Sequence, residues 1–296
     1  MTGRLGAETT AALTAGGLDP AEVARIVRRA LEEDLALGPD VTTDSTVPEG
    51  ARATGDVAPR TRGVLAGVPV AAAVFELVGG PDVDVVLHAA DGSEARPGLP
   101  ALTVSGPARS LLTAERTALN LVSHLSGVAT LTRRWVDAVA GTGAAIRDTR
   151  KTTPGLRALE KYAVRCGGGV NHRMALGDAA LVKDNHVAAA GGIAAAVTAV
   201  RAHAPGVPLE VECDTLEQLR EAIGAGVHLV LLDNFSLADT RAAVELVDGS
   251  GVRLEASGGL DLERARDVAA TGVDYLAVGA LTHSAPVLDL GFDLRD

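Results

Sequence analysis

After Gly143 the sequence repeats one pattern, in which a short apolar strand ends on a polar residue or a glycine and is followed by a helical segment. The segments that read as strands are AAIRDT, AALVKD, LEVEC, LVLLDN, RLEAS and YLAVG, and they end at or near Lys151, Lys183, Glu212, Asp233, Ser257 and Gly279. Successive ends lie about 21 to 32 residues apart, which is the length of one βα unit. Six such units predict a parallel β/α barrel or a near relative of one.

Two of the helical segments between these strands carry start and stop signals. TLEQLREAIGAG begins at Thr215, a residue type that caps helix N-termini, and closes on Gly224 and Gly226. DLERARDVAATG begins at Asp261 and closes on Gly272. Because β/α barrels build their active sites at the carboxyl ends of the strands, the polar strand ends are the candidate site.

The first 140 residues have a different texture. Residues 20–37 place apolar side chains on one face of an opening helix, and residues 50–110 are short apolar runs broken by glycine, proline and aspartate, typical of strands and turns. Residues 111–140 contain no proline and only Gly127, so one helix, or two bent at that glycine, should connect the halves. We therefore predict an α/β protein with an α+β domain over residues 1–117. A β/α barrel domain with a C-terminal tail follows over residues 118–296.

Composition narrows the classes of partner. Aromatic residues make up 2% of the chain, so the core is built from alanine, valine and leucine, and no stacking platform for nucleic-acid bases is expected. The net charge of −11 argues against nonspecific binding to nucleic acid or to anionic membranes. Cys166 and Cys213 are isolated and suggest neither a disulfide framework nor a zinc site. Without a secretory leader or 18 unbroken apolar residues, the sequence predicts a soluble cytoplasmic protein that takes small anions.

The basic residues are unevenly distributed. Of 27 basic residues 24 are arginine, and the three lysines, Lys151, Lys161 and Lys183, lie within 33 consecutive residues. Lysine offers a compact, strongly hydrated charge that arginine does not replace. A cationic segment in an acidic protein predicts a local anion site, although a solvated basic helix face fits the charge pattern alone as well.

Five residues of this segment fall at the first two strand ends or in the loop between them, and we expect them to converge: Arg150, Lys151, His172, Arg173 and Lys183. Arginine pairs bidentately with carboxylates, and lysine holds phosphate as a point charge. Any one of these side chains alone would fit a surface ion pair. Together, at one barrel mouth, they predict a polyanionic ligand.

Carboxylates and glycines occupy the remaining strand ends. Glu212 and Asp233 end consecutive strands, so with a diphosphate ligand they would form a Mg²⁺ site, or alternatively they orient one of the lysines. Ser257-Gly258-Gly259 and Gly279-Ala280 close the last two strands, where barrels either hold a phosphate on backbone N–H groups or simply turn tightly.

The segment DTRKTTPGLRALEKYAVRCGGGVNHRMALGDAALVKDNH, Asp148–His186, resembles quinolinate phosphoribosyltransferase, the carboxylating nicotinate-nucleotide pyrophosphorylase of NAD biosynthesis. The resemblance continues through EEDLALGPDVTTD, TAERTALNLVSHLSGVAT, LEVECDTLEQL, LLDNF, EASGGL and GVDYLAVGALTHS, and so covers nearly the whole chain. It implies an N-terminal α+β open sandwich domain and an incomplete β/α barrel of about seven strands. It also implies a homodimer in which one subunit's N-terminal domain covers its neighbour's barrel.

The resemblance further implies roles for residues at matching positions. Contacts to quinolinate fall to Arg150, His172, Arg173 and Lys183, with Arg116 supplied by the other subunit. The catalytic contacts to 5-phosphoribosyl 1-diphosphate and its Mg²⁺, direct or through water, fall to Lys151, Glu212 and Asp233. The other substrate-binding positions are Thr149, Ser257, Gly258, Gly259, Val278, Gly279 and Ala280. The implied reaction transfers the phosphoribosyl group to quinolinate and gives nicotinate mononucleotide, diphosphate and CO₂.

Two other functions remain open at this point. A related phosphoribosyltransferase-like protein associated with molybdenum transport shares the DTRK and HR motifs, although Lys183-Asp184-Asn185-His186 favours the quinolinate enzyme. A barrel that only binds a phosphorylated metabolite, as a regulator or scaffold, is the noncatalytic alternative. The presence of Lys151, Glu212 and Asp233 argues against it.

Overall fold

The computed structural model describes residues 3–295, whose contacts divide the chain into two compact units. The first unit comprises Met1–Arg133, Thr152–Gly168 and Thr282–Asp296, and the second comprises Arg134–Lys151 and Gly169–Leu281. This division differs from the sequence-based boundary between residues 117 and 118. The reason is that a helix runs through that boundary, while a second helix and the C-terminal strand, both from the predicted barrel half, pack within the first unit.

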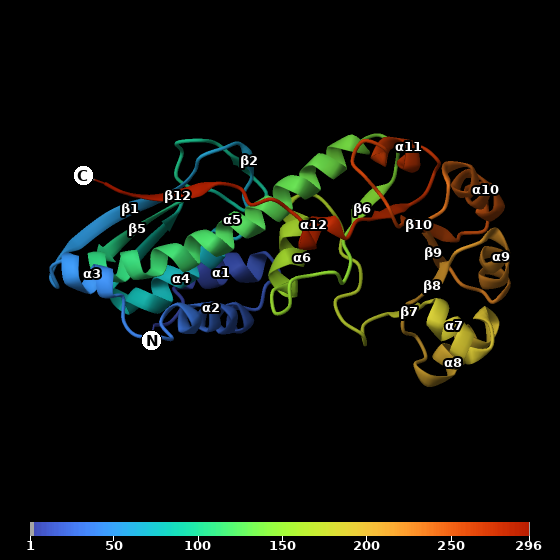
Figure 1. The fold of residues 1–296 in the computed structure, drawn as a ribbon, viewed down its shortest axis with the longest axis horizontal. Coiled ribbons are helices and arrows are strands. Elements are labelled where there is room, and N and C mark those ends of the chain that lie inside the picture. Colours follow the sequence, from blue (N-terminus) through green and yellow to red (C-terminus); the bar gives the residue numbers. More distant parts are fainter. Residues whose placement is uncertain (1–2, 296) are drawn as a thin grey trace. The chain divides into compact units, whose positions relative to one another are not determined.

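The first unit is a four-stranded antiparallel sheet, ordered β12-β1-β5-β3, with helices packed against it (Figure 1). A two-stranded sheet of β2 and β4 accompanies it. Its elements are α1 (Ala7–Ala15), α2 (Pro20–Asp34), α3 (Val41–Thr46), β1 (Arg52–Pro59), β2 (Gly63–Val64), α4 (Val68–Gly79), the 3₁₀ turn η1 (Gly80–Asp82), β3 (Asp84–Leu87), β4 (Glu94–Ala95), β5 (Leu102–Pro107), α5 (Ala108–Ala138), α6 (Arg157–Cys166), α12 (Ala280–His283) and β12 (Leu290–Leu294). The ends of α5 and α12 extend into the second unit.

Helix α4 explains why residues 50–110 read only as strands and turns. Its sequence VPVAAAVFELVG is apolar on every side and buried from Val68 to Leu77, so it shows no amphipathic period. Asp91 fixes its start by accepting hydrogen bonds from the backbone N–H groups of Gly67 and Val68. Burial raises the pKa of the Asp91 carboxyl, which also accepts a hydrogen bond from Tyr162.

The predicted connecting helix is one continuous helix, α5, with no break at Gly127. A Cβ at Gly127 would lie 2.2 Å from the carbonyl oxygen of Pro286, so the glycine lets the C-terminal segment pass close to the helix. Within the described residues, no helix combines the length and the apolar character that crossing a membrane requires.

The second unit contains the six predicted strands, all parallel, in the order β6-β11-β10-β9-β8-β7. The strands are β6 (Ala145–Arg147), β7 (Ala180–Val182), β8 (Leu209–Cys213), β9 (Leu229–Asp233), β10 (Arg253–Ser257) and β11 (Tyr275–Ala277). The described residues form six strands where about seven were expected, and β6 and β7 are not paired, so the barrel is incomplete as predicted. An isolated parallel bridge joins Arg147 to Val170 beside the opening.

The connecting helices are α7 (Asp184–Ala190), α8 (Ile193–His203), α9 (Leu216–Gly224), α10 (Leu237–Val247) and α11 (Ala265–Ala269). Figure 1 shows α9 and α10 on the outside of the strand layer, where they pack on β8 and β10. Thr215 caps α9 as predicted, accepting a hydrogen bond from the N–H of Gln218. Helix α11 is shorter than its sequence suggested, although Asp261 does accept a hydrogen bond from the N–H of Arg264.

Candidate active site

A cavity of about 460 Å³ opens at the carboxyl ends of the barrel strands, and we call it the rim cavity. Most of the polar side chains predicted from strand ends line it together. Its wall consists of Thr149, Arg150, Lys151, His172, Arg173, Leu181, Lys183, Glu212, Leu231, Asp233, Glu255, Ser257 and Ala277. The four residues expected to contact one anion, Arg150, His172, Arg173 and Lys183, therefore share a pocket.

A second and larger cavity, of about 590 Å³, lies at the amino ends of the strands. Its wall is largely apolar and includes turns such as Ala204–Leu209. His172 and Arg173 border both cavities, and Arg147 and Glu210 border only this one. The polar side chains predicted at the strand ends line the smaller cavity, so cavity volume alone does not identify the candidate active site.

The turn after β6 delivers three consecutive predicted residues to the rim cavity. The hydroxyl of Thr149 accepts a hydrogen bond from the backbone N–H of Lys151 at 3.0 Å, which closes the turn. Lys151 is exposed at the mouth, and Arg150 is half-buried. The side chains of Arg150 and Lys151 therefore enter the site at different depths.

Arg150 and Arg173 form the cationic side of the cavity. Burial, together with repulsion from Arg150, lowers the pKa of Arg173 from its ordinary value. The Nε atom of Arg150 is buried and has no hydrogen-bond partner among the described residues. Two neighbouring guanidinium groups, one with an unsatisfied donor, favour an anionic ligand that accepts this hydrogen bond and offsets the repulsion.

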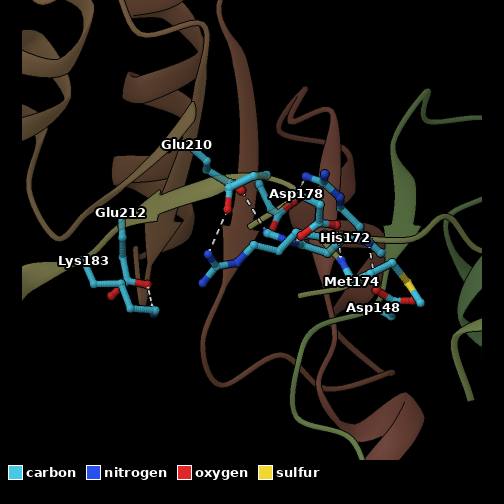
Figure 2. A network of polar contacts seen from close by, with 11 residues as sticks. Asp148, His172, Met174, Asp178, Lys183, Glu210 and Glu212 are labelled. Atoms are coloured by element: carbon cyan, nitrogen blue, oxygen red, sulfur yellow. Dashed lines mark hydrogen bonds and ion pairs between the residues drawn. The ribbon is translucent and has the colours of Figure 1, made fainter. Parts of the chain in front are cut away.

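Lys183 and Glu212 form an ion pair in the wall of the rim cavity, and Figure 2 shows this pair beside the network around His172. Lys183 directly follows β7, and Glu212 lies near the end of the adjacent strand β8. The Lys183 side chain remains 44% exposed, whereas that of Glu212 is 13% exposed. The lysine is thus accessible to a ligand while its partner holds it over the cavity.

Asp233 and Ser257 sit side by side at the ends of β9 and β10, where they are register partners. Asn234 secures this edge: its side chain donates to Asp233 at 2.7 Å and its backbone N–H donates to the Ser257 carbonyl at 2.9 Å. Asn234 has a φ of 56°, and Gly258 has a φ of 86°. A Cβ at Gly258 would lie 2.3 Å from Asn234 Oδ1, so the two turns fit together only with glycine there.

His172 is held from two sides and is not a free cation. Buried Asp148 accepts hydrogen bonds from the His172 N–H at 2.8 Å and from the Asn171 side chain at 2.5 Å, which fixes the loop (Figure 2). The His172 Nδ1 atom accepts the backbone N–H of Arg173 at 2.7 Å. The imidazole proton therefore lies on Nε2, which is 2.8 Å from a carboxylate oxygen of Glu210. The ring therefore accepts at Nδ1 and donates from Nε2 to a buried carboxylate, and it does not stand among the cations of the rim cavity as a separate charge.

Beneath the rim cavity lies a layer of polar side chains, of which the sequence had singled out only His172. We call this layer, made of Arg147, His172, Glu210 and Glu255, the floor cluster. Arg147 Nη1 lies 2.6 Å from Glu255 Oε2, and the Arg147 guanidinium also stacks on the Tyr275 ring at 4.8 Å. Glu255 has no exposed surface, and Glu210 is 3% exposed. Period-2 alternation was the available signal, because Glu210 and Glu255 precede the predicted Glu212 and Ser257 by two residues.

The remaining predicted residues lie elsewhere or at the margin of the cavity. Arg116 is exposed on α5 in the first unit, and Lys161 is fully buried in α6 of the same unit. Gly259, Val278, Gly279 and Ala280 follow the ends of β10 and β11 but are not part of the cavity wall. The Val278 N–H donates to the carbonyl of Arg147 and so belongs to the barrel backbone.

Sequence models of one family match almost the whole chain. Residues 40–126 match the N-terminal domain of quinolinate phosphoribosyl transferase, and residues 128–293 match its C-terminal domain. A carboxylating nicotinate-nucleotide pyrophosphorylase from Mycobacterium leprae is 59% identical over 271 residues, covering 90% of this chain and 95% of that protein. A probable enzyme of the same name from Bacillus subtilis is 42% identical over 263 residues, covering 88% and 90%.

Solved structures show the same fold. The nicotinate-nucleotide pyrophosphorylase from Francisella tularensis superposes with a TM-score of 0.88 at 38% identity, covering 93% of this chain and 96% of that one. The NadC protein from Streptococcus pyogenes gives a TM-score of 0.88 at 40% identity, covering 94% and 99%. Both matches span the two units described above.

Proposed function

We propose a role for each residue of the rim cavity, starting from the fact that this chain belongs to the quinolinate phosphoribosyltransferase family. The chain is a pentosyltransferase of NAD biosynthesis. It transfers the phosphoribosyl group of 5-phosphoribosyl 1-diphosphate to quinolinate, with release of diphosphate and CO₂, and gives nicotinate mononucleotide. The observation that carries the assignment of the site is the convergence of Arg150, Arg173, Lys151 and Lys183 on one cavity.

Quinolinate binds on the arginine side of the cavity. Arg150 and Arg173 pair with its carboxylates, and the unsatisfied Nε of Arg150 supplies one of the hydrogen bonds. Lys183 adds a charge from the opposite wall, released in part from Glu212 when the ligand enters. His172, held neutral between Arg173 and Glu210, shapes this side of the pocket without adding charge.

The phosphoribosyl donor binds along the strand ends from Lys151 to Ser257. Lys151 faces the leaving diphosphate, and Glu212 and Asp233 face the ribose carbon on which positive charge develops. The turns at Ser257, Gly258 and Gly259, with Val278, Gly279 and Ala280, receive the 5′-phosphate. The close fit of Gly258 against Asn234 keeps side-chain atoms away from this edge.

Mg²⁺ fits the donor set of this edge. Glu212 and Asp233 both line the cavity, and hard carboxylate and diphosphate oxygens are the ligands that Mg²⁺ prefers. Neither carboxylate belongs to a cluster of three protein ligands among the described residues, so diphosphate and water would complete the coordination shell. The ion supplies charge neutralisation on the diphosphate, and Lys183 and Asn234 keep the two carboxylates in place until it binds.

The order of events follows from charge. Cations must first offset the repulsion between the quinolinate dianion and the donor, so that the ring nitrogen approaches the anomeric carbon. Diphosphate then leaves toward Lys151. Once alkylated, the ring nitrogen is positive and stabilises the electron pair that remains when the neighbouring carboxylate departs as CO₂. The low polarity of a closed pocket favours this charge-dispersing step.

Arg116 completes the quinolinate pocket from a second subunit in this proposal. It is an exposed arginine on α5, available to a neighbouring chain, and the family resemblance gives it that role. The active form is accordingly a homodimer. The two isolated cysteines, both unpaired in the structure, fit a reducing cytoplasm.

The reaction is tested by incubating purified protein with quinolinate, 5-phosphoribosyl 1-diphosphate and Mg²⁺ and measuring CO₂ and nicotinate mononucleotide. We expect equal amounts of both products and no turnover of nicotinate. Absence of CO₂ at saturating substrates, or equal use of nicotinate, would rule the function out. Omission of Mg²⁺ should abolish turnover, and mixing Arg116→Ala with Lys183→Ala protein should restore activity in mixed dimers that carry one intact site.

A further inference from the structure

The floor cluster contains two carboxyl groups, Glu210 and Glu255, but only one fixed cation, Arg147. If both carboxyl groups are ionised, the cluster carries one negative charge in excess. Arg147 faces Glu255 at 2.6 Å, and neutral His172 faces Glu210 at 2.8 Å. One carboxylate oxygen of each glutamate, Oε1 in both cases, is buried without a hydrogen-bond partner among the described residues. Because an unpaired buried charge is costly, a single proton shared by this layer restores its balance.

The proton belongs on Glu255. Burial is the main cause that raises the pKa of Glu255 to about 7, followed by the charge of Glu210, while the charge of Arg147 acts in the opposite direction. Glu255 Oε1 is 3.7 Å from His172 Nε2, so an added hydrogen does not displace the shorter contact between His172 and Glu210.

The neighbouring strands add no further carboxylate beside Glu255. Its register partners are Leu231 on β9 and Tyr275 on β11. The charged groups that face it are therefore Arg147 from β6 and Glu210 from β8, with His172 from the loop between α6 and β7.

A proton fits this layer better than a metal ion. His172, Glu210 and Glu255 each offer a ligand atom within 4.8 Å of one another. However, His172 Nδ1 already accepts the N–H of Arg173, so Nε2 carries the ring proton. A metal at Nε2 would require an imidazolate, or loss of that 2.7 Å hydrogen bond, next to the Arg147 cation.

We propose that Glu255 is the acid that protonates the ring carbon from which CO₂ leaves. Glu255 lines the rim cavity together with Arg150 and Arg173, the two arginines assigned above to quinolinate. The bond between the ring carbon and the carboxylate breaks, and its electron pair stays on the carbon. The carbon then takes the proton from the Glu255 carboxyl, directly or through one water, which forms the C–H bond of the product and leaves Glu255 as a carboxylate.

Arg147 and the second cavity complete the cycle. The Glu255 carboxylate formed in this step remains paired with Arg147. The cavity at the amino ends of the strands reaches Arg147, His172 and Glu210 from the opposite side. Solvent returns the proton to Glu255 before the next turnover. This inference rests on the decarboxylating transfer assigned above.

The test compares Glu255→Gln with wild type and with Glu245→Gln, a matched change at an exposed position on α10. Glutamine keeps the size and the contact with Arg147 but has no acidic proton. We expect kcat to fall on the order of 100-fold in Glu255→Gln, with KM for both substrates within about threefold of wild type. The wild-type decline in kcat as pH rises through about 7 should disappear in this variant.

A second measurement separates a proton donor from a structural residue. Reactions run in equal parts H₂O and D₂O give a hydrogen-to-deuterium ratio at the new C–H bond that depends on the donor. Glu255→Gln should shift this ratio, because water then donates, and Glu255→Asp should keep the wild-type ratio at a reduced rate. A lowered kcat with an unchanged ratio in Glu255→Gln, or full activity in that variant, overturns the proposal. Should Glu255→Gln not fold, the pH profile and the ratio of Glu255→Asp decide.

The failure of this inference is distinct from failure of the function. Wild-type protein that makes no nicotinate mononucleotide removes the function itself. Wild-type protein that makes it, beside an equally active Glu255→Gln, removes only the role of Glu255.

Discussion

Two pairs of carboxyl groups in the barrel lie at different depths, one inward-facing residue position apart along the strands. Glu212 and Asp233 end β8 and β9 at the rim, and Glu210 and Glu255 lie one inward-facing position deeper on β8 and β10. The rim pair is partly exposed and hydrogen-bonded to Lys183 and Asn234, whereas the deeper pair is buried. Depth along a strand thus separates carboxyl groups that stay open to a ligand from carboxyl groups that are buried, where desolvation disfavours a second negative charge.

The largest expected effect tests the rim. Lys183→Ala should lower kcat/KM for quinolinate on the order of 10³-fold, because it removes one cation of the pocket and leaves Glu212 facing the substrate dianion. KM for the ribosyl donor should change less than about threefold. Steady-state kinetics with each substrate varied in turn make the measurement.

Arg241→Ala, an exposed arginine on α10, is the control for loss of a positive charge and should behave as wild type. Equal losses for both substrates in Lys183→Ala would contradict its assignment to quinolinate. The double change Lys183→Ala with Glu212→Ala then measures how much of the loss comes from the unpaired carboxylate.

Replacing each glutamate of β8 in turn compares the carboxyl group at the rim cavity, Glu212, with the one in the floor cluster, Glu210. Glu212→Ala should lower kcat about 100-fold while changing the free energy of unfolding by less than about 1 kcal/mol, because its partner Lys183 is well solvated. Glu210→Ala should reduce the free energy of unfolding by about 3 kcal/mol, because it leaves the Nε2–H of the His172 ring buried without its acceptor. Urea unfolding checks both, and equal stability losses would erase the distinction.

Much of the rim cavity could be predicted from the sequence because several of its polar residues lie at or just after the end of a strand. A barrel brings such positions together whatever the lengths of its connections, so six apolar runs and their polar ends were enough to place Lys183, Glu212 and Asp233. The sequence did not predict which lysine pairs with Glu212, because the ion pair with Lys183 depends on how far the two side chains extend between neighbouring strands.

The floor was hidden for a physical reason. Glu210 and Glu255 each lie inside a strand between two apolar neighbours, and only the barrel interior reveals that Arg147 and His172 meet them there. The apolar helix α4 was hidden by the opposite feature, since burial on every side removes the amphipathic period. The open barrel of six strands likewise depends on the pairing of β6 with β11, which no local pattern encodes.

The pH dependence of stability should carry the signature of Glu255. Its pKa in the folded protein is raised from 4.5 to about 7, so between these values the unfolded chain loses a proton that the folded chain keeps. This contribution to stability is present below pH 4.5 and is lost as pH rises to about 7. Relative to wild type, Glu255→Gln should therefore gain about 2 to 3 kcal/mol in free energy of unfolding between pH 5 and pH 8.

Urea unfolding at both pH values measures this difference, and Glu245→Gln should show none. A constant gap between Glu255→Gln and wild type across the range would mean that Glu255 is ionised throughout. The deeper pair would then be charged like the rim pair, and the contrast between them would fail.

The smallest expected effect concerns the turn beside the rim pair. Gly258→Ala should cost about 1 to 2 kcal/mol of stability, because alanine must adopt a φ near 86° and its Cβ would lie 2.3 Å from Asn234 Oδ1. Gly224→Ala is the control, since it ends α9 with nothing within 4 Å of the added Cβ. Displacing Asn234 also loosens Asp233, so KM for the ribosyl donor should rise in Gly258→Ala while KM for quinolinate stays within about twofold. A stability loss without that change in KM would make the turn purely structural and separate Asp233 from the donor site.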